Sequence, residues 1–229
     1  MNAQYHKIKA GVTLVELLVV ITIIAAMMAI LLPAMARARL TAKVLVASKE
    51  LSQIGLALDA YEVSNNSWPL VRPDCGKLSE LYSLPPELIK GGYLPGYKEG
   101  VLLYNDVEDE FYAGHSYRYL TVGPTLSIYG KPTNSNMTLY MPAAFPADAR
   151  AVIKDYSDRK QAPVKWIVFS LGPNYDTKAM ENAEWRGFPL GDGFPFLNES
   201  WYNPKTQKGI LAYIKTNRDQ YFGTFQSGR

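Results

Sequence analysis

A run of 20 residues without a charged side chain, residues 17–36, constrains this chain more than any other feature of its sequence. As an α-helix rising 1.5 Å per residue, the run would be about 30 Å long, which is the thickness of the hydrocarbon core of a bilayer. A cleaved secretory signal has a shorter apolar core followed by small residues, whereas here Arg37 and Arg39 follow. The sequence therefore predicts a helix that spans a membrane once.

Charge is unevenly distributed at the start of the chain. The net charge is +3, and Lys7 and Lys9 lie in the first eleven residues, which contain no acid. Beyond residue 11 there are 22 basic and 21 acidic residues, a balance that gives no reason to expect nucleic-acid binding. A basic leader before a membrane span is expected to stay in the cytoplasm.

Glu16 stands immediately before the apolar run, where a carboxylate is costly unless it has a partner. Together with its surroundings it resembles the prepilin (class III) signal of type IV pilins and type II secretion pseudopilins. The matching residues are Lys7, Lys9, Gly11, Thr13 and Glu16, followed by Leu-Leu-Val-Val-Ile. The resemblance implies that a prepilin peptidase cleaves between Gly11 and Val12, and that Val12 is then N-methylated.

The same resemblance implies a role for Glu16 in assembly. Cleavage creates a new amine at Val12, and an unpaired charge in a low-dielectric bundle costs several kcal/mol, of order 3–5 when a buried pair is broken. In a stack of helices, Glu16 of one subunit is expected to pair with the Val12 ammonium of a neighbour and so set the register. Pro33 lies where many pilins carry a helix-loosening proline.

Past Arg39, apolar or small residues recur in alternating steps of four and three, which is one face of a helix. These residues are Leu40, Val44, Ala47, Leu51, Ile54, Leu58 and Tyr61. One helix is therefore predicted from residue 12 to 63. We divide the chain into a leader (1–11), a membrane and filament-core helix (12–36), its amphipathic continuation (37–63) and a globular head (64–229).

The head begins with turn-forming residues, among which Asn65 or Asn66 is expected to cap the helix. Residues 61–69, Tyr-Glu-Val-Ser-Asn-Asn-Ser-Trp-Pro, resemble the segment that ends the long helix of type II secretion pseudopilins. Short runs rich in branched and aromatic residues predict strands at 116–122, 138–141, 165–171 and 209–214. A long helix packed on a small antiparallel sheet is an α+β fold, the pilin fold.

Two acidic regions are candidate cation sites. Residues 166–176 resemble the strand and acidic loop of major pseudopilins, in which calcium binds. The resemblance implies calcium at Asn174, Asp176 and Asp192, with a solvated loop as the alternative. Residues 105–110 form the densest acidic cluster and are predicted to be a charged loop, with cation binding as the alternative.

No enzyme signature is found in the sequence. Of the two histidines, His6 lies in the leader and His115 has no paired motif, while Ser170 lacks the flanking glycines of a nucleophile elbow. Paired-cysteine metal motifs, phosphate loops and dinucleotide fingerprints are absent from the sequence. No catalytic residue is predicted.

Two classes of function remain. The first is a structural subunit of a pseudopilus or type IV pilus-like filament for type II secretion. Its partners would be prepilin peptidase, other pilin-like subunits and an inner-membrane assembly platform. It would lie in the inner membrane with its leader cytoplasmic and its head periplasmic or extracellular. The second is a minor pilin-like binding module, favoured by the long region 101–158.

Overall fold

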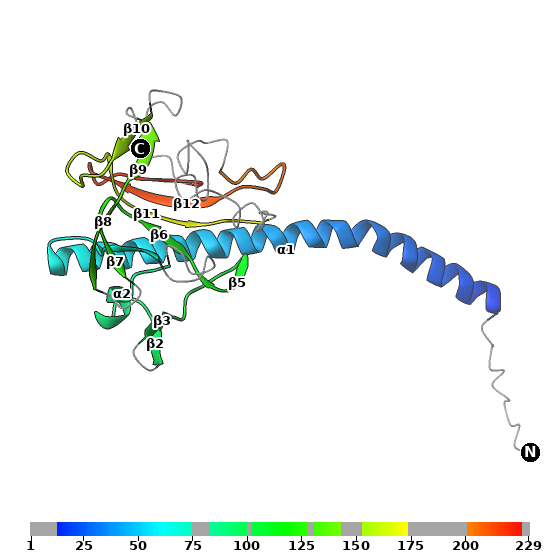
Figure 1. Cartoon of the computed structure of the whole chain (residues 1–229). Helices are drawn as coiled ribbons and strands as arrows, with labels where there is room; N and C mark the ends of the chain where they lie inside the picture. Colours follow the sequence, from blue (N-terminus) through cyan, green and yellow to red (C-terminus); the bar gives the residue numbers. More distant parts are fainter. Residues whose placement is uncertain are drawn as a thin grey trace, which may run out of the picture. The chain divides into compact units, whose positions relative to one another are not determined.

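The computed structural model describes residues 13–74, 83–99, 102–127, 131–142, 153–173 and 201–225 of this 229-residue chain. The chain divides into two compact units, residues 1–41 and 42–229. Helix α1 (Leu14–Asn65) is the first element, and short strands make up most of the rest (Figure 1). A long helix followed by antiparallel sheets confirms the predicted α+β class.

The end of α1 has a clear local cause. The helix ends at Asn65, two residues beyond the predicted end at residue 63, and Asn66 adopts a left-handed conformation with φ 54°. A left-handed residue stops a helix, and asparagine enters that region more readily than most residues. The predicted cap is therefore confirmed at Asn66.

The second half of α1 contributes one face to the hydrophobic core. The predicted stripe is buried at five of its positions: Val44, Ala47, Leu51, Ile54 and Leu58. Its two end residues, Leu40 and Tyr61, are partly exposed. The period of the pattern thus placed the buried face correctly, because residues three and four apart share a side of a helix.

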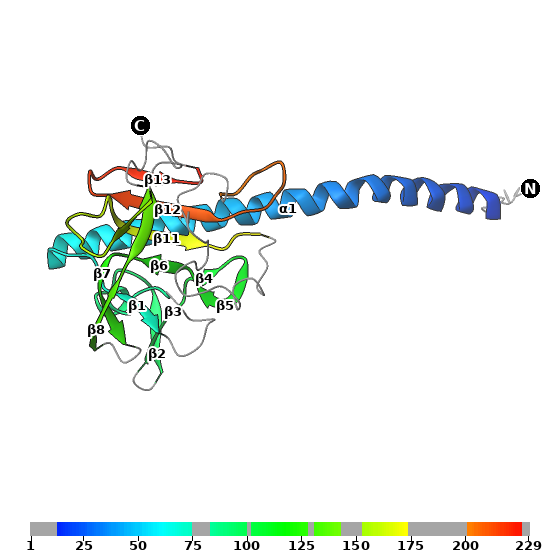
Figure 2. The same cartoon turned by 45° about the horizontal axis from the view of Figure 1, so that its top comes forward.

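The helix packs on a four-stranded antiparallel sheet with the strand order β13-β12-β11-β6 (Figures 1 and 2). The strands are β6 (Arg118–Leu120), β11 (Val164–Ser170), β12 (Leu211–Thr216) and β13 (Tyr221–Gly223). Every residue of β11 except Lys165 is buried, as expected for a central strand covered on both faces.

Close packing of α1 on this sheet depends on Gly55. A Cβ at this position would lie 2.4 Å from Cε1 of Tyr213 and 3.0 Å from the Trp166 ring. The two aromatic side chains lie beside each other, with ring centroids 5.8 Å apart. Glycine weakens a helix slightly, but here it lets two large rings contact the helix backbone.

The remaining described strands form one three-stranded and three two-stranded sheets. In the three-stranded sheet, with order β1-β7-β8, β1 runs parallel to β7. The strands of these sheets are β1 (Val71–Asp74), β2 (Gly96–Glu99), β3 (Leu102–Asn105), β4 (Glu108–Asp109), β5 (Tyr112–Ser116), β7 (Gly123–Ser127), β8 (Pro132–Met137), β9 (Leu139–Pro142) and β10 (Ile153–Tyr156). A short helix, α2 (Glu87–Lys90), lies between β1 and β2 in the chain.

The four predicted strands are confirmed as β6, β9, β11 and β12. The prediction of a charged loop at residues 105–110 is wrong, because β4 pairs with β5 and the Asp109 side chain is only 4% exposed. Two-residue strands and polar strands such as β8 carry no alternating pattern, so their existence depends on pairing with distant segments.

Replacing Gly55 with alanine should destabilise the protein. Overpacking against Tyr213 and Trp166 costs roughly 1–3 kcal/mol, which we expect to exceed the gain in helix propensity of about 1 kcal/mol. Urea unfolding of the detergent-solubilised full chain, followed by tryptophan fluorescence, measures the difference. Gln53→Ala, on an exposed position of the same helix, is the control and should not destabilise. A Gly55→Ala protein as stable as the wild type would contradict the packing argument.

Candidate assembly site and its anchor

The start of α1 is closed by a reciprocal pair of hydrogen bonds between Thr13 and Glu16. The Glu16 backbone N–H donates to Thr13 Oγ1 (3.2 Å), and the Thr13 backbone N–H donates to Glu16 Oε2 (2.8 Å). The Thr13 hydroxyl also donates to Oε2 (2.8 Å). This is a capping box, in which threonine and the glutamate three residues later satisfy each other's backbone. The sequence Thr-Leu-Val-Glu contains this capping signal in full.

The capping box engages one of the two carboxylate oxygens of Glu16. Its Oε2 is engaged by Thr13, whereas Oε1 accepts no hydrogen bond from any residue in the described ranges. One oxygen therefore holds the carboxylate in place while the other has free lone pairs. A carboxylate fixed in this way at a helix start can accept an ammonium group without losing its own cap.

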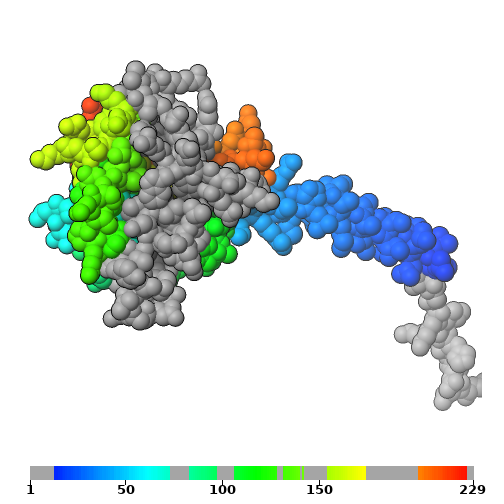
Figure 3. Space-filling model, viewed as in Figure 1, coloured from blue at the N-terminus to red at the C-terminus, as the bar shows by residue number. Residues whose placement is uncertain are grey.

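Downstream of Glu16, α1 exposes apolar side chains on all sides. Leu17 is 60% exposed and Ile30 is 78% exposed, and the large apolar side chains between them are at least 46% exposed (blue in Figure 3). By length and composition α1 can cross a membrane, and among the described residues it is the one helix that can. Such a surface is unfavourable in water and becomes stable when lipid or other apolar helices cover it.

The other predicted site residues are Pro33, the two residues of the cleavage site and the three calcium ligands. Pro33 lies inside α1, which continues through it. Gly11 and Val12, the predicted cleavage site, lie outside the described residues. So do Asn174, Asp176 and Asp192, and calcium binding there stays a prediction. Within the described ranges, no group of three or more His, Cys, Asp or Glu side chains is placed to hold a metal ion.

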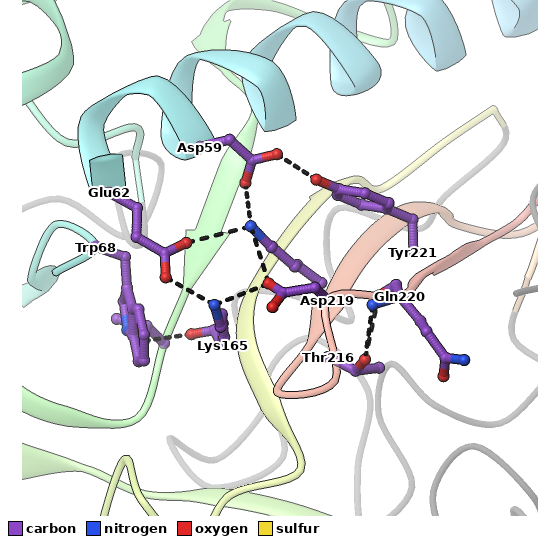
Figure 4. A network of polar contacts seen from close by, with 10 residues as sticks. Asp59, Glu62, Trp68, Lys165, Thr216, Asp219, Gln220 and Tyr221 are labelled. Carbon is purple, nitrogen blue, oxygen red and sulfur yellow. Dashed lines mark hydrogen bonds and ion pairs between the residues drawn. The ribbon is translucent and has the colours of Figure 1, made fainter. Parts of the chain in front are cut away.

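A network of charged side chains, which the sequence did not reveal, fastens the end of α1 to the sheet (Figure 4). Lys215 on β12 contacts Asp59 (2.7 Å) and Glu62 (3.2 Å) on α1. Lys165 on β11 contacts the other oxygen of Glu62 (2.7 Å) and also Asp219 (2.9 Å). We call these five residues the lysine–carboxylate network.

The lysine–carboxylate network is shielded from water mainly around its lysines. The Lys215 side chain is only 8% exposed. Burial alone would lower the pKa of Lys215, but the bonds and charges of Asp59 and Glu62 outweigh it and raise that pKa. The hydroxyl of Tyr221 donates to the second oxygen of Asp59, and burial together with this bond raises the pKa of Tyr221 to about 12. The lysines therefore stay charged and paired.

The turn after α1 is held by a second set of contacts. The guanidinium of Arg159 lies 5.1 Å from the ring centroid of Trp68, and its Nε donates to the carbonyl of Val122 (2.8 Å). The indole N–H of Trp68 donates to Thr121 Oγ1 (2.5 Å). The hydroxyl of Tyr119 donates to the carbonyl of Pro69 (2.7 Å). The Trp-Pro pair noticed in the sequence thus anchors the chain where it leaves the helix.

A buried carboxyl group lies where β4 meets β11. Asp109 Oδ1 accepts hydrogen bonds from the backbone N–H of Phe111 (2.9 Å) and from Ser170 Oγ (2.8 Å). Burial raises the pKa of Asp109 to about 6, and its hydrogen bonds and the Arg118 charge offset only part of this. The Glu50 charge from α1 adds to the increase.

Comparison with known proteins gives two matches. The family described as the prokaryotic N-terminal methylation motif matches residues 6–32. The type IV major pilin protein PilE1 of Neisseria gonorrhoeae is 25% identical over 183 residues, covering 76% of this chain and 99% of that protein. No solved structure matches the chain.

An N-terminal methylation motif, a long apolar helix and a helix-on-sheet unit together define the pilin-like class of proteins. This chain is a type IV pilin-like protein, by that motif and by its similarity to a type IV major pilin.

Replacing Lys215 with glutamine should destabilise the protein by about 2 kcal/mol. Breaking a fully buried ion pair costs roughly 3–5 kcal/mol, and the loss is smaller here because Lys165 and Tyr221 still contact the freed carboxylates. Urea unfolding measures the loss in the free energy of unfolding, with Lys131→Gln at an exposed position as the control. The double variant Asp59→Asn, Lys215→Gln should lose less than the sum of the single variants. Strict additivity would show that the pair is not coupled.

Asp109 should make stability fall as pH rises. Its pKa is about 6 in the folded chain and 3.8 ordinarily, so its contribution is fully present below pH 3.8 and is lost as pH rises through 6. The wild type should therefore gain stability relative to Asp109→Asn, by roughly 1–2 kcal/mol, between pH 7 and pH 5. Unfolding curves across this range measure the difference, with Asp155→Asn at an exposed position as the control. A pH-independent difference would contradict the burial argument.

Proposed function

We propose that this chain is a subunit of a pseudopilus or type IV pilus-like filament, assembled by stacking of its apolar helices. The observation that carries the proposal is an N-terminal methylation motif joined to a helix whose apolar side chains are exposed on every side. That surface suits two environments, a bilayer before assembly and a bundle of identical helices afterwards.

Processing comes first in the proposed sequence of events. Prepilin peptidase cleaves between Gly11 and Val12, inside the stretch that matches the methylation motif, and Val12 is N-methylated. The new Val12 ammonium of one subunit then pairs with Glu16 of a neighbour. The capping box supports this step, because it holds Glu16 at the helix start while Oε1 stays free to accept the amine. Pro33 loosens α1 so that neighbouring helices can adjust.

The proposed location follows from the same segment. The protein crosses the inner membrane once, with the leader in the cytoplasm and the globular head in the periplasm or outside the cell. Its partners are prepilin peptidase, copies of itself or other pilin-like subunits, and an inner-membrane assembly platform.

The machine that the filament serves has two candidates. Residues 61–69 resemble the helix end of type II secretion pseudopilins, and their Trp68 is held there by Arg159 and Thr121. That favours a pseudopilus for protein secretion. The type IV major pilin PilE1 matches along nearly its whole length, which favours a pilus. Long filaments on cells that secrete normally after deletion would support the pilus, and loss of secretion would support the pseudopilus.

A minor pilin-like binding module is the alternative. The region 101–158 contains β8, a sheet-edge strand among the described residues, with exposed polar side chains at Asn134, Ser135 and Asn136. Abundance separates the two functions. A major subunit dominates sheared filaments, whereas a binding module is rare or confined to the tip.

Mass spectrometry of membrane-extracted protein, from a host with prepilin peptidase, should find a mature chain that begins with methylated Val12. Glu16→Gln should be processed in the same way but incorporated poorly into filaments, because glutamine keeps the capping box and removes the charge. Glu16→Ala, which removes both, should lose assembly to a similar extent. Thr13→Val is the converse control, because it keeps the charge of Glu16 and removes the Thr13 hydroxyl that accepts the Glu16 backbone N–H.

Two outcomes would overturn the proposal. An intact leader in that host would show that the chain is not processed as a prepilin. Normal filament incorporation of Glu16→Gln would show that the charge of Glu16 does not direct assembly.

A further inference from the structure

The C-terminal unit, residues 42–229, begins a short distance beyond the predicted membrane span. The apolar run ends at residue 36, and α1 continues through residues 37–41 into the unit. At 1.5 Å per residue these residues cover about 8 Å, and the headgroup layer on each side of a bilayer is about 5–8 Å thick. The end of the unit at which α1 enters, which we call the entry end, is therefore within reach of lipid headgroups whenever the run spans a bilayer.

Strand β12 runs along α1 from the entry end toward the other end of the unit. Its first residue, Leu211, lines a groove together with Leu45 of α1, whereas Lys215, next to its last residue, contacts Asp59. The segment that leads into β12, residues 201–210, therefore lies at the entry end. Both views show this segment there in orange (Figures 1 and 2).

Within this segment, residues 203–208 form a closed loop that carries two exposed lysines, Lys205 and Lys208. The Asn203 backbone N–H donates to the Lys208 carbonyl (2.9 Å), and the Gln207 backbone N–H donates to the Asn203 carbonyl (2.7 Å). The Asn203 side chain accepts the backbone N–H of Lys205 (2.8 Å). In the described ranges, no carboxylate forms an ion pair with either lysine. The loop thus presents two positive charges on a fixed backbone.

Exposed apolar side chains lie beside this loop. Phe225 is 47% exposed, and its ring centroid lies 6.3 Å from that of Tyr202, which directly precedes the loop. Leu45, which is 59% exposed, and the exposed Lys49 line the groove together with Phe225. Membrane proteins place aromatic rings at the level of the headgroups, and lysines there bind anionic lipids. The entry end has both kinds of side chain.

Acidic side chains at the entry end belong to a different part of the unit. Glu108 lies on β4 and Glu110 follows it, and Lys43 of α1 lies 3.8 Å from the Glu110 carboxylate. The hairpin of β4 and β5 and the orange segment lie on opposite sides of α1 in both views (Figures 1 and 2). The helix therefore separates these acids from the exposed lysines of the loop.

We propose that Leu45, Lys49, Lys205, Lys208 and Phe225 form a surface that binds anionic phospholipid headgroups of the membrane that α1 crosses. Charge complementarity names the partner, because each lysine near an anionic surface favours contact by about five-fold. The helix supplies the partner at a high effective concentration, since it fixes the unit beside the bilayer. The contact holds the unit in one orientation until the subunit enters a filament. This inference rests on the proposed membrane crossing and is independent of filament assembly.

Quenching by lipid headgroups tests this contact in the full chain. Cys75, the single native cysteine, is replaced by serine, and Thr206→Cys, at an exposed position of the loop, carries a fluorescent label. The protein is reconstituted into nanodiscs of phosphatidylcholine with a nitroxide on its headgroup, with or without phosphatidylglycerol. Phosphatidylglycerol should increase quenching of the label roughly two-fold or more. Molar salt shortens the screening length to about 3 Å and should reverse the increase.

Matched variants separate the loop from charge in general. Lys205→Gln with Lys208→Gln should lower the ratio of bound to free loop by about thirty-fold and so abolish the effect of phosphatidylglycerol. Lys154→Gln with Lys160→Gln removes the same charge from exposed positions and should leave the effect unchanged. These control positions precede β11, whose first residue pairs with the last residue of β12 at the other end of the unit. A label at the exposed Ser157→Cys, between them, should be quenched equally in both lipids.

The outcomes distinguish this inference from the proposed function. Equal quenching of the Thr206→Cys label with and without phosphatidylglycerol would overturn the inference, as would equal losses in the two double variants. A chain that does not insert into nanodiscs would overturn both the inference and the proposed membrane crossing. Lipid-dependent quenching in a chain that never forms filaments in cells would support the contact and overturn the filament function.

Discussion

The contact of α1 with the four-stranded sheet is the interaction on which the rest of this protein depends. It is possible because Gly55 has no side chain where Tyr213 and Trp166 meet the helix. The buried stripe of α1 supplies one wall of the core, and β11, buried along nearly its whole length, supplies the other. The helix face that remains outside is then available for contacts with other molecules.

Charge is arranged differently at the two ends of α1. At its start, Glu16 is held by Thr13 in a capping box that is exposed in the single chain. At its end, Asp59 and Glu62 are paired with lysines from the sheet that are themselves largely shielded from water. Among the described residues, the first carboxylate has hydrogen bonds to one oxygen only, whereas both oxygens of Asp59 and of Glu62 are bonded within the fold. That contrast distinguishes the carboxylate that we propose to act in assembly from the carboxylates that stabilise the fold.

A pilin-like subunit has to be stable both alone in a membrane and inside a filament. The first half of α1 serves both states, since lipid and neighbouring helices cover the same apolar side chains. The C-terminal unit carries its own core and does not depend on that half for burial of the stripe from Val44 to Leu58.

Local patterns in the chain were sufficient for the long helix, its buried face, the Asn66 cap and the strands that became β6, β9, β11 and β12, because each depends on neighbours within a few residues. The capping box of Thr13 and Glu16 is equally local and was readable from Thr-Leu-Val-Glu. Only folding brought Lys215 to Asp59, 156 residues earlier, or buried Asp109 beside Ser170. Ion pairs, short polar strands and grooves arise from residues far apart in the chain, and no spacing in the sequence records which distant segment will come to lie beside them.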